Sequence, residues 1–395
     1  MKIFQSMDTK TRKAIPYGRQ SITERDIKAV VEVLNADYLT TGPKVNEFEE
    51  KFAEYVGSKY AVAVANGTAA LHLSALALDV NENSKVITST ITFAASANCI
   101  RYCGGHVEFC DIDPETKTLD LKKLKGILES APKGTYQGVV PVDFAGFPVH
   151  MEKLKELANQ HGLWIIEDAC HAPGGWFTDS KGKEHKCGNG KFAELAIFSF
   201  HPVKHIACGE GGMITTDDEL LYNKLKQLRT HGMVYQGDER LTENHGNWYM
   251  EMQDLGYNYR IPDILCALGV TQLEKADAGL ERRREIAARY DEAFQNTRIK
   301  INVPPSDIGH AYHLYVVEVE NRKELYDALR EDKIYAQIHY VPVHTMPYYK
   351  SLNPNQASLP LAEEYYKRCI SLPMYPTLTA EEQAFVINKV IEYSN

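Results

Sequence analysis

The chain has 395 residues, of which 44% are hydrophobic and 25% charged, and its formal net charge is −9. This composition is typical of a folded protein of two or three domains and argues against disorder. An acidic chain without a basic run is a poor candidate for unspecific binding to nucleic acid or to an anionic membrane. The start of the chain is polar and polar residues interrupt its most apolar stretch, 60–80, so we expect a cytoplasmic protein without a membrane span.

The first half of the chain predicts an alternation of helices and short strands. Ser21-Ile-Thr-Glu24 is a capping-box pattern that predicts an early helix over 27–34. The expected helices that follow are 45–56, 67–78, 94–102, 121–129 and 151–161, and the expected strands are 61–65, 85–88, 107–110, 138–143 and 163–168. Short apolar strands that alternate with helices are typical of an α/β fold with a mostly parallel sheet covered on both faces.

The second half adds strands over 193–200 and 212–216, and its polar, Gly-rich segment 178–191 predicts a surface loop or hairpin. The pattern from 263 to 296 predicts one long helix. After it, segments 314–319 and 337–340 and a helix that begins with a Thr379–Glu382 capping box suggest a smaller α+β domain. We therefore expect a large α/β domain over 1–275 and a small α+β domain over 276–395.

The eight cysteines are scattered and form no C-x-x-C pair, so we expect free thiols and no disulfide framework. Zinc binding through Cys170, Cys187, Cys208 and a histidine would need paired-ligand spacing, which is missing, and we expect no metal site. Residues 188–193 match the G-x-G-x-x-A dinucleotide pattern. A dinucleotide-binding motif follows a strand and opens the helix that holds the pyrophosphate. Here the pattern follows a polar loop and opens a strand, so we expect no dinucleotide site.

Polar side chains gather at the carboxyl ends of expected strands, where open α/β sheets bind their ligands. Asn66-Gly67-Thr68-Ala69 opens a helix directly after a strand, and the amides and dipole of such a turn attract an anion. Asp168 ends an apolar strand, where an acid either caps a helix or needs a cationic or hydrogen-bonding partner. Lys204 follows the strand that ends near Ser199. A lysine after a strand is usually solvated, but one held in this turn can be desolvated enough to attack a carbonyl.

A polar-aromatic turn, Gly256-Tyr-Asn258-Tyr-Arg260, precedes the expected long helix and either reaches an anion or caps that helix. Taken together, an anion-binding helix start, a buried acid and a lysine suggest a cofactor with a phosphate, a basic ring nitrogen and an aldehyde. Pyridoxal phosphate has all three. In this interpretation Lys204 forms the Schiff base and Asp168 keeps the pyridine nitrogen protonated.

Several stretches resemble the DegT-type sugar aminotransferases, which are fold type I pyridoxal-phosphate enzymes, over essentially the whole chain. They include NGTAALHL, EDACHAPGG, SFHPVK, GEGG and GYNYR. Within the family, SFHPVK, VDFAG and His171 favour the branch of pseudaminic acid biosynthesis. That resemblance implies transfer of an amino group from L-glutamate to a UDP-linked 4-keto-6-deoxy-N-acetylhexosamine. The product would be UDP-4-amino-4,6-dideoxy-N-acetyl-β-L-altrosamine, with pyridoxamine phosphate as the intermediate form of the cofactor.

The resemblance also implies roles for residues around the cofactor ring. Lys204 would carry the cofactor and then act as the acid and base of the proton shift. Asp168 would pair with the pyridine nitrogen, His171 would lie near the phenolic oxygen of the ring, and Phe93 would stack on its face.

For the phosphate, the resemblance implies Gly67, Thr68 and Ala69 together with the Ser199 hydroxyl. Asn258 would reach the phosphate of the neighbouring protomer's cofactor, which implies a homodimer with shared active sites. The candidates for contact with the nucleotide sugar are Arg229, Tyr315 and His339.

Three alternatives remain open. The first is a related aminotransferase for another nucleotide sugar, such as a perosamine-type or 3-keto-sugar enzyme. A deoxysugar dehydratase of the same fold is less well supported, because such relatives replace the lysine by histidine. The last is a non-catalytic protein of this fold. Two features depart from the family pattern: Cys170 stands where relatives have Ala or Ser, and the longer loop 178–191 could alter access of the sugar.

Overall fold

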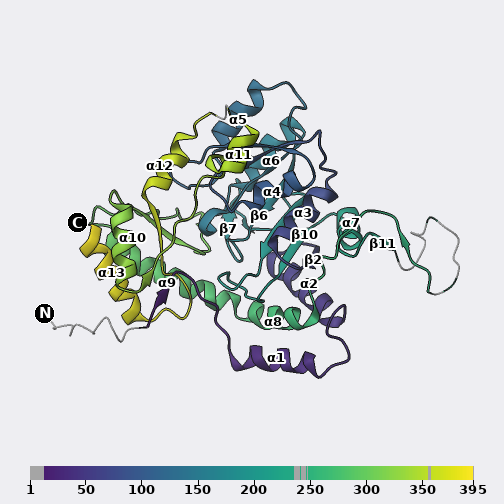
Figure 1. Cartoon of the computed structure of the whole chain (residues 1–395), viewed down its shortest axis with the longest axis horizontal. Coiled ribbons are helices and arrows are strands. Elements are labelled where there is room, and N and C mark those ends of the chain that lie inside the picture. Colours follow the sequence, from purple (N-terminus) through teal and green to yellow (C-terminus); the bar gives the residue numbers. More distant parts are fainter. Residues whose placement is uncertain (1–12, 235–240, 242–245, 247, 355–356, 395) are drawn as a thin grey trace.

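A seven-stranded sheet forms the centre of the molecule, with helices around it (Figure 1). The computed structural model describes residues 13–234, 241, 246, 248–354 and 357–394. The strand order is β2-β10-β9-β6-β5-β3-β4, and only β10 runs antiparallel to its neighbours. The strands are β2 (Tyr60–Val64), β3 (Lys85–Ser89), β4 (His106–Cys110), β5 (Gly138–Val140), β6 (Trp164–Asp168), β9 (Leu195–Ser199) and β10 (Gly212–Thr216). The expectation of a mostly parallel sheet is confirmed.

Both faces of this sheet are buried, as the side chains of β2 demonstrate. Ala61 and Ala63 belong to one hydrophobic core, and Val62 and Val64 to another on the opposite face. Because successive side chains of a strand point to opposite faces, apolar residues at every position require cover on both sides.

The helices of this region follow the predicted order. They are α1 (Glu24–Leu34), α2 (Pro43–Val56), α3 (Gly67–Ala77), α4 (Ala95–Tyr102), α5 (Leu121–Ser130), α6 (Met151–His161), α7 (Glu219–Arg229), α8 (Asp263–Glu274) and α9 (Ala276–Phe294). The sequence analysis did not predict α7, although Asp218 caps it by accepting from the amides of Leu220 and Leu221.

A second hydrophobic core lies among the C-terminal elements and α9. These elements are the antiparallel pair β14 (Tyr315–Glu318) and β16 (Cys369–Leu372) and helices α10 (Arg322–Glu331) and α13 (Ala380–Ser394). The 3-10 turn η2 (Val343–Thr345) and helices α11 (Pro347–Leu352) and α12 (Pro360–Arg368) pack in two smaller clusters. The Thr379–Glu382 capping box that starts α13 is confirmed. The domain boundary at 275/276 stays a prediction.

The N-terminal strand β1 (Ile15–Pro16) contributes to this second core and not to the sheet that follows it in the chain. It pairs in parallel with β15 (Ile334–Tyr335), and Ile15 is buried in the second core. This pairing carries the start of the described chain to the C-terminal region.

Three local predictions are wrong. The capping box of α1 is formed by Thr23 and Asp26 instead of Ser21 and Glu24, because Thr271 and Lys275 fix the buried Asp26 carboxylate at the helix start. For the same reason the expected long helix breaks at Lys275 (φ −110°, ψ 8°), whose ammonium is held by Asp26. Segment 337–340 is not a strand; only an isolated bridge joins Gln337 to Ser371.

The polar segment 178–191 does form a hairpin. Strands β7 (Trp176–Thr178) and β8 (Glu184–Lys186) pair, and β13 (Ile308–Gly309) adds a third strand. The remaining short elements are the pair β11 (Met233–Val234) and β12 (Glu251–Met252) and the 3-10 turn η1 (Phe144–Gly146).

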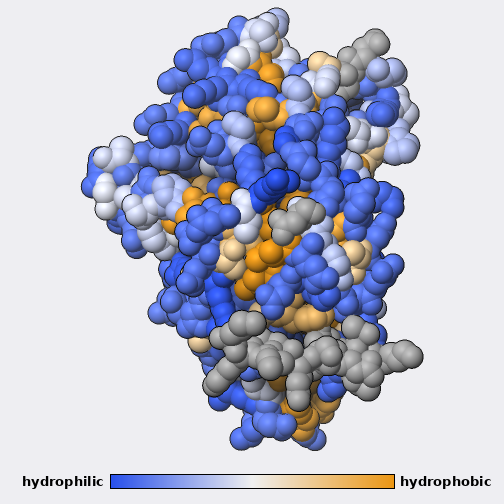
Figure 2. Space-filling model, turned by 90° about the vertical axis from the view of Figure 1, so that its left-hand side faces the viewer, coloured by the Kyte–Doolittle hydropathy of each residue, from blue (hydrophilic) through white to orange (hydrophobic). Residues whose placement is uncertain are grey.

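The side of the molecule that carries the C-terminal helices is mostly hydrophilic, with hydrophobic atoms in strips between polar side chains (Figure 2). Within the described ranges we find no helix with the length and apolar character that a membrane crossing requires.

Candidate active site

A cavity of about 550 Å³ opens where β2, β6 and β9 end at one edge of the sheet. This volume falls in the range of small-molecule sites. Of the residues selected from the sequence, the cavity is lined by Gly67, Thr68, Phe93, Asp168, His171, Ser199, Lys204 and His339. The structure therefore brings together residues that lie up to 272 positions apart, from Gly67 to His339.

The start of α3 borders this cavity. Asn66 caps the helix, and its Oδ1 accepts from the amide of Ala69 over 2.8 Å. That amide is thus already bonded, and Ala69 does not line the cavity. The amides of Gly67 and Thr68 stand at the first helical positions, where no helical carbonyl can accept from them. Together with the helix dipole, these two amides are better placed to bind an anion than the amide of Ala69.

Gly67 allows α3 to approach the end of β9. A Cβ on Gly67 would lie 3.0 Å from Cβ of Ser199 and 3.6 Å from Sγ of Cys170. Any larger residue would push the helix start away from the Ser199 hydroxyl. The close approach places a hydroxyl donor beside the two free amides, as phosphate binding needs.

Asp168 is buried at the end of β6 and is held by two donors. The Ser96 hydroxyl donates to its Oδ2 over 2.6 Å, and the Cys170 amide donates to its Oδ1 over 3.2 Å. These two donors fix the orientation of the carboxyl group. A fixed carboxylate at this position can hold a protonated ring nitrogen.

Behind Asp168, on the other face of β6, lies a buried carboxyl pair. Side-chain ligand atoms of Asp143, Glu167 and Cys187 lie within 4.8 Å of one another. Glu167 accepts from the Gly188 amide over 3.1 Å, and Val149 donates to one oxygen of Asp143. Burial raises the pKa of Asp143 to about 7 and raises the pKa of Glu167 well above its usual range, with Asp143 as a further cause. A proton shared between the two carboxyl groups accounts for this cluster without a metal ion.

Lys204 projects its amine into the cavity from the turn after β9, where its own amide donates to the carbonyl of His201. Within the described residues its Nζ has no hydrogen bond and no ion pair. Burial lowers the pKa of Lys204, although the nearby Cys170 and Asp168 act in the opposite direction. An unpaired lysine amine with a lowered pKa is a competent nucleophile and base.

The imidazole of His171 lies beside Lys204 and is held in one orientation. Its Nδ1 accepts from the Ala145 amide over 3.2 Å, and its Nε2 lies 3.3 Å from the Tyr340 hydroxyl. Burial, together with Lys204, lowers the pKa of His171 well below its usual value. Because Nδ1 accepts, the hydrogen-bond pattern assigns the proton of the neutral ring to Nε2, which can donate to a phenolic oxygen.

Phe93 is 63% exposed at the cavity, so one face of its ring is open to a ligand. Its ring centroid is 6.4 Å from that of Tyr340. A planar ligand stacked on Phe93 would cover this surface.

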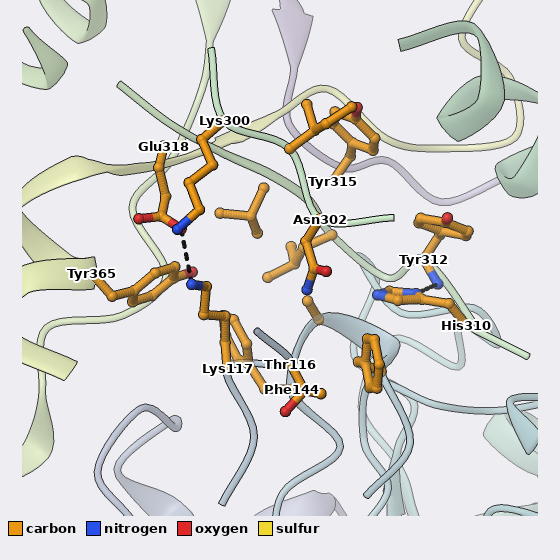
Figure 3. A pocket seen from close by; sticks show the side chains of 15 residues that line it. Thr116, Lys117, Phe144, Lys300, Asn302, His310, Tyr312, Tyr315, Glu318 and Tyr365 are labelled. Atoms are coloured by element: carbon orange, nitrogen blue, oxygen red, sulfur yellow. Dashed lines mark hydrogen bonds and ion pairs between the residues drawn. The ribbon is translucent and has the colours of Figure 1, made fainter. Parts of the chain in front are cut away.

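Besides Ala69, three selected residues do not line the cavity: Arg229, Tyr315 and Asn258. Arg229 pairs with the buried Glu49 and donates to the carbonyl of Ala63 over 2.7 Å, so it ties α7 to the sheet. Tyr315 lines a second, narrow cavity with Lys117 and Glu318 (Figure 3). Its hydroxyl donates to Asp291.

Asn258 is exposed in the turn before α8 and does not line the cavity of its own chain. The carbonyl of the adjacent Tyr259 accepts from the Ala65 amide over 2.8 Å, which fixes the turn near the α3 start. An exposed, fixed amide side chain is available to a neighbouring molecule.

The sequence analysis missed several residues that line the cavity or support it: Tyr17, Ser96, His201, Glu210, His313 and Tyr340. The ring of His313 lies 4.2 Å from that of His171, between centroids. SFHPVK and GEGG already contained His201 and Glu210, so motif membership was a usable signal for these two. Tyr17 and His313 carry no such local signal.

Loop 178–191 contributes no side chain to the lining of this cavity. Its Gly188 instead supports the Asp143–Glu167 pair. Within one chain, loop 178–191 therefore supports the face of β6 that carries Glu167 and does not cover the cavity.

The groups at the cavity fit pyridoxal phosphate. The anion site at α3 matches the phosphate, Asp168 the ring nitrogen, and the unpaired Nζ of Lys204 the aldehyde. The exposed face of Phe93 matches the flat ring.

Residues 20–391 match the model of the DegT/DnrJ/EryC1/StrS aminotransferase family. The chain belongs to this family. The prediction of a DegT-type aminotransferase with this fold is therefore confirmed, and the protein is an aminotransferase.

The aminotransferase is 39% identical to spore coat polysaccharide biosynthesis protein SpsC of Bacillus subtilis, over 97% of this chain and 98% of that one. It is 38% identical to the UDP-4-amino-4,6-dideoxy-N-acetyl-beta-L-altrosamine transaminase of Campylobacter jejuni, over 94% and 95% of the two chains. Among solved structures it resembles Helicobacter pylori PseC, an aminotransferase involved in the biosynthesis of pseudoaminic acid. That match has a TM-score of 0.86 and 30% identity and covers 97% of this chain and 99% of that chain.

Proposed function

We propose that this aminotransferase uses pyridoxal phosphate bound to Lys204 to move an amino group from L-glutamate to a UDP-linked 4-keto-6-deoxy-N-acetylhexosamine. The product is UDP-4-amino-4,6-dideoxy-N-acetyl-β-L-altrosamine. The single observation that carries the proposal is the unpaired amine of Lys204 in one cavity with Asp168 and the α3 anion site. The altrosamine transaminase relative and the PseC structure support the choice of substrate.

When bound, the cofactor supplies an electron sink for the bond to the α-carbon of the amino donor. Asp168 holds the ring nitrogen in its protonated state, since Ser96 and Cys170 keep this carboxylate fixed. The Nε2 proton of His171 donates to the phenolic oxygen. Gly67, Thr68 and Ser199 hold the phosphate and so fix the orientation of the ring.

Lys204 moves the proton. Its Nζ takes a proton from the α-carbon of the amino donor and delivers one on the return half of the reaction. Burial favours the neutral amine that the first of these transfers requires, because it lowers the pKa of Lys204. Burial lowers the pKa of His171 and of His313 well below the usual value, so both imidazoles are neutral. They therefore place no positive charge beside the Lys204 amine.

The proposal includes a homodimer in a cytoplasmic location. Asn258 is exposed beside the α3 start and does not reach its own cavity, which supports a contact with the phosphate in the partner subunit. Sharing of sites is tested by mixing two inactive variants, Lys204→Ala and Asn258→Ala. If sites are shared, mixed dimers hold one intact site and regain activity. If each chain supplies its own Asn258, mixing restores nothing.

Relatives of nearly equal identity carry names from different pathways, spore coat polysaccharide and altrosamine. An aminotransferase for another nucleotide sugar is therefore the second candidate. Incubation with glutamate, pyridoxal phosphate and a panel of keto nucleotide sugars, followed by identification of the aminated product, separates the two. Amination of a sugar other than the UDP-linked 4-keto-6-deoxy-N-acetylhexosamine would replace the first proposal by the second.

A further inference from the structure

The ring of His171 is held by two polar contacts, and both are long. The Ala145 amide donates to its Nδ1 over 3.2 Å, and its Nε2 lies 3.3 Å from the Tyr340 hydroxyl. A ring that turns its Nε2 proton to a cofactor oxygen gives up the contact with Tyr340. One long hydrogen bond then remains, and it restrains the tilt of the ring only weakly. The packing around His171 therefore decides how well this donor is aimed.

Among the described residues, His313 carries the aromatic ring that packs closest to His171. The two ring centroids lie 4.2 Å apart, with 38° between the ring planes, whereas the rings of Phe144 and Tyr340 lie 6.3 and 6.2 Å from His171. His313 is buried and lines the active-site cavity. Its Nδ1 is buried without a hydrogen-bond partner in the described part of the chain. Its effect on His171 is therefore one of ring packing and not of a hydrogen bond.

The turn η1 fixes both imidazoles relative to each other. The amide of Ala145 donates to His171, and the carbonyl of Ala145 accepts from the Leu314 amide over 3.1 Å. Gly146 permits close packing here, since its φ is +98° and a Cβ on it would lie 2.9 Å from the His171 carbonyl oxygen and 3.0 Å from the His313 amide nitrogen. Because one turn contacts both histidines, the position of one ring is set by that of the other.

Two further groups confine His313. Arg283 of α9 is buried, and its Nη1 donates to the carbonyls of Tyr312 and His313 over 3.1 and 3.3 Å. The ring of His205 lies 5.8 Å from that of His313, between centroids. With its backbone and its ring both confined, His313 is a rigid support that loses little conformational entropy when a ligand binds in the cavity.

We propose that His313 is a positioning residue for His171. Its ring holds the His171 imidazole in the orientation in which Nε2 donates to the phenolic oxygen of bound pyridoxal phosphate. This inference rests on the proposed function, because that oxygen belongs to the proposed cofactor. A donor to the oxygen favours loss of the proton that the oxygen shares with the nitrogen of the Lys204–cofactor linkage, and so lowers the pKa of this linkage. Loss of the positioning should raise that pKa.

The test is a pH titration of the cofactor absorbance in purified holoenzymes. His171→Ala removes the donor, His313→Ala removes the ring that packs on it, and the double variant removes both. His313→Phe restores a flat ring without nitrogens. His313→Val, which also lacks a ring, replaces His313→Ala if that variant does not fold. His310→Ala is the matched control, because His310 is a buried histidine of the same segment and does not line the cavity.

We expect His313→Ala to raise the midpoint of this titration by roughly 0.5–1 pH unit, the effect of one weakened hydrogen bond. His171→Ala should raise the midpoint at least as far. The double variant should match His171→Ala, because His313 acts through His171 and the two effects are not additive. His313→Phe and His310→Ala should keep the wild-type midpoint.

A larger shift in the double variant than in His171→Ala would show that His313 acts on the cofactor by itself, and would overturn the inference. So would an unchanged midpoint in the ringless variants, or loss of cofactor binding in His313→Ala but not in His171→Ala. An equal shift in His310→Ala would assign the effect to packing of the whole segment, and a shifted His313→Phe would assign it to a ring nitrogen; either result contradicts the proposal. A wild type without cofactor absorbance is a different result and would refute the proposed function instead.

Discussion

The hydroxyl of Ser96 donates to Oδ2 of Asp168 over 2.6 Å, although 72 residues separate the two in the chain. A second hydroxyl, that of Thr92, lies 2.7 Å from Ser96 Oγ. Both residues are buried, so the carboxylate is held from the α4 side by a short chain of hydroxyls. This arrangement keeps Asp168 oriented toward the ring nitrogen of the proposed cofactor.

Replacement of Ser96 by alanine should weaken cofactor binding. A hydrogen bond to a charged group contributes more than a neutral one, and its loss corresponds to roughly tenfold to hundredfold in affinity. Fluorescence titration of the apoprotein with pyridoxal phosphate measures the change, and Ser96→Thr should restore most of it. Ser74→Ala is the control, since this buried hydroxyl bonds, among the described residues, only to the carbonyl of Ala70 in its own helix. Equal affinities for Ser96→Ala and Ser74→Ala would contradict the role of Ser96.

Replacement of Lys204 by alanine or arginine should abolish turnover, because neither side chain can supply a neutral primary amine at the cavity. Two measurements check this expectation. Multiple-turnover assays should show no product above background in either variant. Borohydride reduction of the wild-type holoenzyme, followed by peptide mapping, should place the cofactor on the peptide that contains Lys204. A label on another peptide would falsify the assignment.

Gly67→Ala should weaken cofactor binding, because the added methyl group would lie 3.0 Å from Cβ of Ser199 and separate the two sides of the anion site. The same crowding should cost about 1–3 kcal/mol in the free energy of unfolding. Gly126→Ala serves as the control, since nothing lies within 4 Å of its Cβ. As a helical glycine, Gly126 should gain about 1 kcal/mol on this substitution. Urea denaturation and cofactor titration measure both effects; unchanged affinity in Gly67→Ala would argue against the phosphate site.

The Asp143–Glu167 pair should make stability depend on pH. Burial raises the pKa of Asp143 from its ordinary 3.8 to about 7. Between these values the folded state binds more protons than the unfolded state, so the free energy of unfolding falls as pH rises toward 7 and then levels off. Asp143→Asn removes the contribution of Asp143, whereas burial still raises the pKa of Glu167 in the variant.

The wild type should therefore lose about 2 kcal/mol more than Asp143→Asn between pH 5.5 and pH 8, at 1.36 kcal/mol per pH unit. Urea denaturation at the two pH values gives the difference. The exposed Asp37→Asn is matched in charge change and should keep the wild-type slope. Parallel pH profiles for the wild type and Asp143→Asn would show that the pair shares no proton.

Much of the fold could be read from the sequence, because strand and helix periodicity are local properties. The strands that carry Asn66, Asp168 and Ser199 at their ends were predicted within a few residues, as was the helix that starts at Gly67. Two failures had a tertiary cause. The Asp26 carboxylate bonds to Thr271 and Lys275. These contacts place the N-cap of α1 at Thr23 and end α8 at Lys275.

The sequence by itself determined the parallel sheet, the family and the lysine, acid and anion-binding turn, since each depends on residues adjacent in the chain. Only the tertiary structure decided which residues share one cavity. It brought in Tyr17, Ser96 and His313, and it placed Arg229 in an ion pair with Glu49 and Tyr315 beside a different cavity. Contacts between segments hundreds of residues apart depend on how whole layers pack, and local patterns do not contain that information.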